Sequence, residues 1–185
     1  MDISATHTFA EEAGISLSDA PAPLFQLLTL CMLQAKPIKA SVAVRAARGL
    51  FGAGLTTPGA MRAARRPTLI RIFGSTGYKR YDESTATRLR AMSASLLDDH
   101  GGDLRTLRPG APASLEIFDG VGPACALMFA REAQGVWPEL APVFDAKALQ
   151  GADKLGLSTD PADLAGLSDD LPRLAAHLVR VALSP

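Results

Sequence analysis

Two glycines flank a valine at Gly120-Val121-Gly122, and a proline follows at Pro123. The surrounding sequence predicts a short helix before this triplet and another helix after it. Glycine permits positive φ angles and lets another backbone approach closely. Pro123 in the first helical turn leaves the next amides free, so the turn could bind a phosphate through main-chain N–H groups. An ordinary glycine-rich turn between two helices is the alternative.

The cysteines and histidines do not form a recognisable metal or thiol site. Cys31 and Cys125 are far apart in sequence, whereas structural zinc or a four-iron cluster generally needs four ligands in closely spaced groups. Each cysteine lies in an apolar stretch, which predicts a buried free thiol. His7, His100 and His177 show no spacing that suggests a base for a catalytic thiol. We therefore expect no iron–sulfur cluster and no thiol chemistry.

The formal net charge is zero, but the charges are unevenly distributed along the chain. The segment from Lys36 to Arg108 carries 14 Lys or Arg residues against 5 Asp or Glu residues, a local charge of +9. The segments before and after it are acidic. This pattern is typical of a protein with one surface that faces a polyanion. Docking of the acidic segments onto the basic one is the alternative.

Apolar residues recur at helical spacing in most of the chain, and strand signals are nearly absent. The run from Pro23 to Leu33 predicts a core helix that ends before Pro37. Thr57-Pro58 is typical of a helix start, and Gly101-Gly102 of a helix end. The expected helices span residues 23–33, 38–51, 57–64, 67–74, 81–100, 114–118, 123–134, 145–155 and 171–183. The predicted fold class is all-α.

Several motifs together resemble the endonuclease III family within the helix-hairpin-helix DNA glycosylases. The Gly-Val-Gly hairpin is followed by an apolar segment, a Gly-Trp-Pro-like turn, an aspartate and a Leu-Gly-Leu segment, in the order that the family shows. In this sequence they are Gly120–Gly122, Gly135–Pro138, Val143–Lys147 and Leu155–Leu157. Upstream, Phe25–Leu28, Leu33–Ala35 and Leu96–Gly102 are similar to the family's core helix, its glutamine and the helix end before the hairpin. The resemblance runs from about Pro23 to Leu157.

The resemblance implies that Asp145 is the catalytic carboxylate of a DNA glycosylase. Such a carboxylate stabilises the positive charge of the sugar and orients or deprotonates the attacking water. A helix N-cap is the structural alternative for Asp145. The family's nucleophilic lysine would stand at Ala124, so we expect a monofunctional enzyme without Schiff-base chemistry. Lys147 and Lys36 are expected near the pocket as phosphate contacts, with residual lyase activity as the alternative.

Two further departures from the family narrow the expected activity. Adenine-specific relatives carry a glutamate where this chain has Leu30, so removal of adenine from mismatches is not expected. The cluster-binding tail is also missing, because no cysteine follows Cys125. DNA binding would then depend on the hairpin and on the basic middle segment.

DNA contacts are expected at the hairpin residues Gly120, Val121, Gly122 and Ala124, and at six further side chains. Gln34 matches the family's glutamine that fills the gap left by the extruded base. Lys36 follows Gln34 by two residues, and Lys147 follows Asp145 by two residues. Tyr78, flanked by Lys79 and Arg80, lies in the loop that carries the family's wedge residue, where a ring could stack on a base. Tyr81 is a rival wedge, and a packing role for Tyr78 is the alternative.

The resemblance also implies a possible K⁺ or Na⁺ ion in the hairpin, held by the main-chain carbonyls of Glu116, Phe118 and Val121. No other cofactor is expected.

The sequence thus predicts a two-lobed helix-hairpin-helix glycosylase fold. Residues 23–140 would form a helical barrel lobe with the hairpin, and residues 1–22 and 141–185 a second lobe. The expected protein is a monomer that acts on damaged or mismatched double-stranded DNA. No membrane segment or secretory signal is evident, so we expect a cytoplasmic, nucleoid-associated location. A non-catalytic DNA-binding or damage-recognition protein is the main alternative, and a helical scaffold without a nucleic-acid role is the third.

Overall fold

The computed structural model describes all residues from 1 to 185 and contains helices but no strands. The all-α fold class predicted from the sequence is therefore confirmed. The α-helices are α1 Phe9–Glu12, α2 Pro21–Gln34, α3 Ala40–Gly52, α4 Pro58–Ala63, α5 Arg66–Thr76, α6 Asp82–His100, α7 Pro123–Ala133, α8 Ala146–Lys154, α9 Pro161–Ala165 and α10 Leu171–Leu183. Three 3₁₀-helices join them: η1 Leu104–Gly110, η2 Ala113–Ile117 and η3 Pro138–Leu140.

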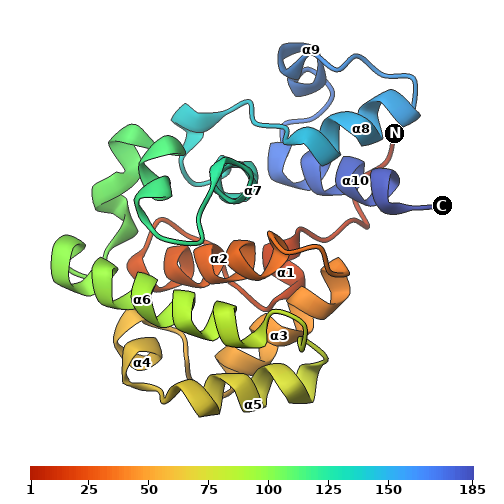
Figure 1. Ribbon diagram of the computed structural model, residues 1–185. Helices are drawn as coiled ribbons and strands as arrows, with labels where there is room; N and C mark the ends of the chain where they lie inside the picture. Colours follow the sequence, from red (N-terminus) through yellow and green to blue (C-terminus); the bar gives the residue numbers. More distant parts are fainter.

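Helix α2 forms the centre of the molecule. Every residue from Leu27 to Leu33 is buried, because α3, α6 and α7 pack around it. Figure 1 shows this helix enclosed by the other elements. The predicted core helix is confirmed. Its sequence, apolar all round, has no polar face to turn toward water.

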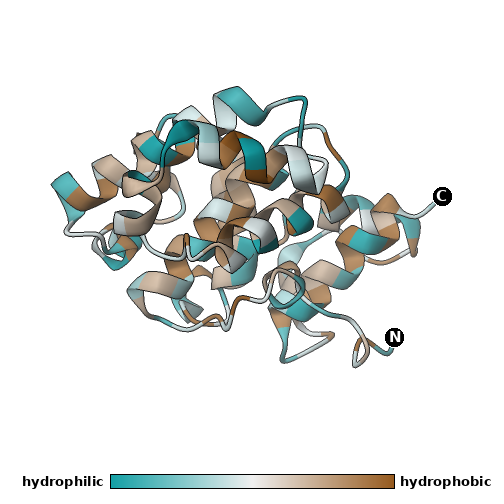
Figure 2. Ribbon diagram, turned by 90° about the horizontal axis from the view of Figure 1, so that it is seen from below, coloured by the Kyte–Doolittle hydropathy of each residue, from teal (hydrophilic) through white to brown (hydrophobic).

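The boundaries of α3 to α6 follow local sequence signals. The Thr57 hydroxyl caps α4 by accepting a hydrogen bond from the Ala60 amide at 3.2 Å. Gly77 and Gly101 end α5 and α6 in the left-handed region, with φ of 84° and 61°, as glycine does at helix C-termini. Figure 2 shows hydrophobic and hydrophilic residues interspersed along the helices.

Helices α8, α9 and α10 lie together on one side of the molecule, and both chain termini lie beside them (Figure 1). Helices α8 and α10 touch at Gly151, where an added Cβ would lie 1.8 Å from the Leu178 carbonyl oxygen. Only glycine permits this contact.

The N-terminal segment is bound to α10 by ion pairs. Arg173 contacts Glu11 at 2.8 Å, and Arg180 contacts Glu12 at 3.0 Å. One hydrophobic core of 44 residues includes side chains from all parts of the chain, so the division into lobes at residues 22/23 and 140/141 stays a prediction. No helix has the length and hydropathy that a membrane crossing requires.

Candidate active site and DNA-binding hairpin

The hairpin turn lies between η2 and α7, and its backbone requires glycine at one position. Gly120 has a φ of 90°, and an added Cβ there would lie 2.7 Å from the Arg88 Cδ atom. The Val121 amide donates a hydrogen bond to the Phe118 carbonyl at 3.1 Å. The Val121 side chain is buried in the core, so only its main chain can contact DNA.

The N-terminus of α7 is exposed and has no side-chain cap. Gly122 is the N-cap residue and Pro123 occupies the first turn. Gly122, Pro123 and Ala124 are all exposed, and nothing lies within 4 Å of the position that a Cβ on Gly122 would take. The 11-residue helix therefore presents free amides and the positive end of its dipole to solvent. Phosphate binding at this turn remains a prediction.

Asp145 is a buried carboxylate at the start of α8. Its side chain accepts a hydrogen bond from the Ala148 amide at 3.3 Å through Oδ1, so it is the N-cap that the structural alternative describes. Its Oδ2 accepts a second bond from Arg131 Nη1 of α7 at 3.0 Å. Asp145 is 8% exposed and Arg131 is 3% exposed. The ion pair thus joins α7 to α8 in the interior.

Asp145 and Arg131 face a cavity of about 300 Å³ between α2, α3, α7, α8 and α10. Gln34, Lys36 and Lys147 also line it, so the structure brings together four of the residues selected from the sequence. The remaining lining residues are Phe9, Pro37, Ile38, Lys39, Ala40, Met128, Val179 and Leu183. The Gln34 amide oxygen and the Arg131 Nε atom are buried without a hydrogen-bond partner in the protein.

Ala124 lies on the same face of α7 as two lining residues. Met128 and Arg131 follow it at i+4 and i+7, which places all three along one side of the helix. At 1.5 Å per residue, Ala124 and Arg131 are about 10 Å apart along the axis. A methyl group therefore stands between the hairpin and the cavity, where the resemblance would place a lysine.

Tyr78 is buried in the core rather than exposed at the surface, which corrects its expected role as the wedge. Its ring is 1% exposed and packs on Phe73, with 5.1 Å between ring centroids. Its hydroxyl donates to the Leu33 carbonyl at 3.2 Å and contacts Thr85. This hydrogen bond ties the loop to the central helix, so the packing alternative holds for Tyr78.

Tyr81, the rival residue, is half-buried at the surface beside two cations. Lys36 Nζ lies 5.4 Å from its ring centroid, and Arg80 Cζ also lies 5.4 Å from it. Lys79 and Arg80 are exposed. Because Lys36 lines the cavity, Tyr81 is the tyrosine near the candidate site. Lys147 Nζ lies 3.1 Å from the Gln150 side-chain oxygen.

Sequence reasoning missed Arg131 and Phe9 as members of the site. Arg131 lies in an apolar helix at a position that helical spacing predicts to be buried, and a buried arginine needs a partner. A charged residue at a position predicted to be buried was the sequence feature that could have identified Arg131. Phe9 comes from a four-residue helix, and no periodicity places so short an element.

Both cysteines are buried free thiols, as predicted. Burial raises the pKa of Cys125 to about 12 and raises the pKa of Cys31 as well. Neither thiol forms the nucleophilic thiolate at neutral pH.

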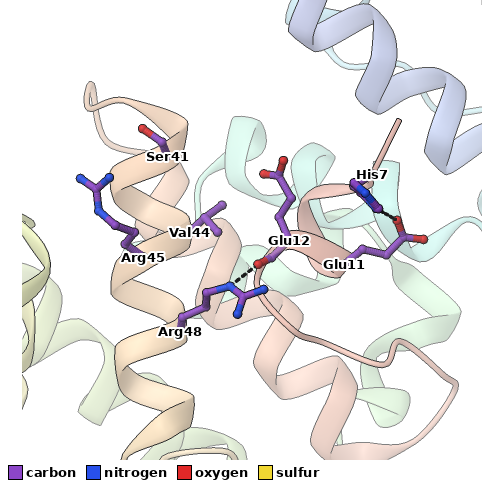
Figure 3. Close-up of a pocket in the computed structure, with 7 residues that line it drawn as sticks. All are labelled: His7, Glu11, Glu12, Ser41, Val44, Arg45 and Arg48. Atoms are coloured by element: carbon purple, nitrogen blue, oxygen red, sulfur yellow. Dashed lines mark hydrogen bonds and ion pairs between the residues drawn. The ribbon is translucent and has the colours of Figure 1, made fainter. Parts of the chain in front are cut away.

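A second cavity, of about 450 Å³, lies between α1 and α3 (Figure 3). His7, Glu11 and Glu12 line one side, and Ser41, Val44, Arg45 and Arg48 line the other. The Arg48 Nε atom donates to the Glu12 carbonyl, while Arg45 points away from the acidic residues. This surface hollow does not include Asp145 or the hairpin.

No family model matches the chain, and no curated protein matches it. Solved structures do. A 3-methyladenine DNA glycosylase of H. pylori (MagIII), bound to 1,N6-ethenoadenine, superposes with a TM-score of 0.61 at 14% identity, over 95% of this chain and 89% of that one. A trapped endonuclease III–DNA covalent intermediate superposes with a TM-score of 0.57 at 16% identity, over 92% of this chain and 79% of that one.

Both similar structures are helix-hairpin-helix glycosylases, and their likeness extends over nearly the whole of this chain. The protein therefore has the helix-hairpin-helix DNA glycosylase fold that the sequence motifs predicted.

Proposed function

We propose that the protein is a monofunctional DNA glycosylase that removes a damaged or mismatched base from double-stranded DNA as a monomer. The observation that carries this proposal is the position of Asp145. Its carboxylate is buried at a cavity, and it is held by Arg131 of the helix that begins at the Gly120–Gly122 hairpin. The hairpin opens α7 and the reacting carboxylate caps α8, and the Arg131–Asp145 ion pair joins the two helices.

The cavity would receive the extruded base, which must leave the duplex before its glycosidic bond can be reached. As the bond between C1′ and the base nitrogen breaks, its electron pair leaves with the base and positive charge develops on the sugar. Asp145 would stabilise that charge and take a proton from the water that attacks C1′. Each carboxylate oxygen has two acceptor positions, so the bonds to Arg131 and Ala148 leave acceptor capacity for this water.

Ala124 is the reason to propose hydrolysis alone. A methyl group cannot attack C1′ or form a Schiff base. Lys36 and Lys147 line the cavity, and we propose that they contact phosphates beside the extruded nucleotide while their positive charge also acts on the base in the cavity. The absence of lyase activity through either lysine is part of the proposal.

We assign binding of the DNA backbone to the hairpin, Lys79 and Arg80. Gln34 would fill the gap that the extruded base leaves in the duplex. Tyr81 replaces Tyr78 as the stacking residue, because its ring is half-buried at the surface and lies 5.4 Å from both the Lys36 and the Arg80 cation. The hairpin carbonyls of Glu116 and Val121 accept no main-chain hydrogen bond, whereas that of Phe118 accepts one from Val121. Such carbonyl oxygens suit a hard monovalent cation, and we propose K⁺ or Na⁺ there.

A non-catalytic DNA-binding protein is the second candidate, and two observations favour it. Both oxygens of Asp145 already accept hydrogen bonds, and the position of the nucleophilic lysine holds alanine. A protein that had lost catalysis could keep the hairpin and use the ion pair for stability.

A substrate panel separates the two candidates. Duplexes that contain uracil, thymine glycol, an alkylated purine or a mismatch are incubated with excess protein, and abasic sites are revealed by alkaline strand cleavage. The glycosylase proposal predicts abasic sites in at least one duplex, without strand scission before alkali. Salt-dependent binding to every duplex with no abasic site in any of them would support the non-catalytic protein.

A further inference from the structure

The candidate base pocket offers no free negative charge. Asp145 is the single carboxylate among its lining residues, and Arg131 already contacts it at 3.0 Å. A base that carries a positive charge would have to compete with this guanidinium for the same carboxylate, inside a region where both groups are almost fully buried.

The pocket also offers no free aromatic face. Phe9 is its one aromatic residue, and its ring is 2% exposed. The guanidinium carbons of Arg131 and Arg180 lie 5.1 Å and 4.4 Å from the ring centroid. Cations bind aromatic rings through the electron-rich face, and here two arginines already occupy the position that a cationic base would need.

Three lysines are also among the lining residues: Lys36, Lys39 and Lys147. None of them forms an ion pair within the protein. Lys36 lies over the Tyr81 ring, and Lys147 contacts a glutamine oxygen. The electrostatic balance of the pocket is therefore positive, with its only negative group already paired.

We infer that the pocket selects electrically neutral bases and discriminates against N-alkylated purines that carry a positive charge in DNA. The inference deepens the proposed function and rests on it. When a neutral base is cleaved, the electron pair of the C1′–N bond leaves with it, so the base departs as an anion and then takes up a proton. The attacking water forms the new C1′–O bond and gives one proton to Asp145. The positive lining stabilises the departing anion.

A cationic purine departs as a neutral base and gains nothing from that lining. We attribute the selectivity of this pocket to Arg131, Arg180 and the lysines rather than to the fold, which is shared with a structure that is named for 3-methyladenine and is bound to 1,N6-ethenoadenine.

The test compares rate enhancement on matched duplexes that contain hypoxanthine or uracil, both neutral, or 7-methylguanine, which is cationic. Single-turnover base release is divided by the spontaneous release from the same duplex without protein. The inference predicts an enhancement for a neutral base about 100-fold or more above that for 7-methylguanine. An equal or larger enhancement for 7-methylguanine would overturn it. Release from none of the duplexes would instead contradict the proposed function.

Binding to non-cleavable 2′-fluoro duplexes tests the charge preference even without turnover. Wild-type protein should bind the neutral-base duplex more tightly than the 7-methylguanine duplex, and equal binding of the two duplexes would contradict the inference.

Lys36→Met and Lys147→Met should each lower the neutral-base enhancement about tenfold. Lys79→Met is the matched control, because Lys79 lies outside the pocket. Lys79→Met should weaken binding to all duplexes alike and leave unchanged the ratio of the neutral-base enhancement to the 7-methylguanine enhancement. An equal change of this ratio in all three variants would overturn the assignment to the pocket.

Discussion

Asp145 and Arg131 form an ion pair that is nearly excluded from water. Removing two charges from water is costly, and a buried pair often contributes less to stability than apolar side chains of the same size would. The pair does fix the orientation of the carboxylate, because Arg131 contacts one oxygen and the Ala148 amide the other. A group held in this way is preorganised for charge that develops beside it. We therefore interpret Arg131 as a positioning residue for Asp145.

Arg131→Met replaces the guanidinium by an apolar chain of similar length. We expect DNA affinity to stay within about threefold and base release to fall about 100-fold, because the carboxylate loses its orientation. Arg131→Lys should recover part of the rate. In the double variant with Asp145→Asn, the loss should be no larger than in Asp145→Asn alone. Single-turnover rates and binding isotherms measure base release and DNA affinity. The positioning role would be contradicted if the rate losses of the two substitutions multiplied in the double variant, or if the rate loss of Arg131→Met matched its loss of DNA affinity.

Ala124 gives a second prediction that concerns a single residue. Because it shares a face of α7 with Met128 and Arg131, Ala124→Lys should place an amine at the cavity and create Schiff-base chemistry. Borohydride should then trap a covalent protein–DNA complex that the wild type does not form. Ala162→Lys, an exposed position on α9 away from the cavity, is the matched control. Equal trapping by the two variants would show that Ala124 does not face the pocket.

The hairpin and α7 act as one element, and its two glycines have different structural roles. Gly120 has a positive φ and packs against Arg88, whereas Gly122 has a φ of −91° with open space around it. The first glycine is required for the fold of the turn. The second leaves open space at the helix N-terminus, where we propose that a phosphate binds.

Substitution by alanine should separate these roles. Gly120→Ala should destabilise the protein by about 1–3 kcal/mol, because an L-residue is strained at that φ and its Cβ meets Arg88. Gly122→Ala should change stability by less than about 0.5 kcal/mol but weaken DNA binding, since its methyl group would lie where the phosphate approaches. Urea unfolding and binding isotherms on both variants provide the measurement. Loss of stability in Gly122→Ala, or unchanged affinity, would contradict this assignment.

Across the whole molecule, the long helices and their ends could be predicted from the sequence, because spacing, Thr57 and Gly101 act locally. The convergence of Gln34, Lys36, Asp145 and Lys147 on one cavity followed from the family resemblance. Tyr78 was assigned wrongly, because only tertiary packing decides whether a tyrosine in a basic loop faces DNA or the core. Helices α1 and α9 have four and five residues, which is too short for a periodic signal.

Glu132 links the N-terminal segment to α7 and gives a pH-dependent prediction for the whole fold. It is 2% exposed, and its carboxylate accepts a hydrogen bond from the Phe9 amide at 2.9 Å. Burial raises its pKa above the ordinary value, so the folded state binds the proton more tightly than the unfolded state. Its contribution to stability is therefore present at low pH and is lost as pH rises through the raised pKa.

Glu132→Gln keeps an oxygen that can accept the Phe9 bond but does not ionise. We expect its stability relative to wild type to increase between pH 4 and pH 7, as measured by urea unfolding. Glu139 is the control of opposite sign, because the Arg108 guanidinium lowers its pKa. Glu139→Gln should lose stability relative to wild type over the same range. A Glu132→Gln difference that stays constant or falls with pH would refute the account of this buried carboxyl.

Asp145, as we propose, acts as the reacting carboxylate of a glycosylase. The most direct measurement is the single-turnover rate of base release by wild type and by Asp145→Asn, on the best substrate of the panel and at saturating protein. Asparagine can still accept the Ala148 amide bond at the N-cap, but stability falls because the buried Arg131 charge loses its carboxylate; urea unfolding and a binding isotherm therefore check that the variant is folded and binds DNA under the assay conditions. The account predicts a rate at least about 100-fold lower for the variant. Equal rates in the two proteins would contradict it.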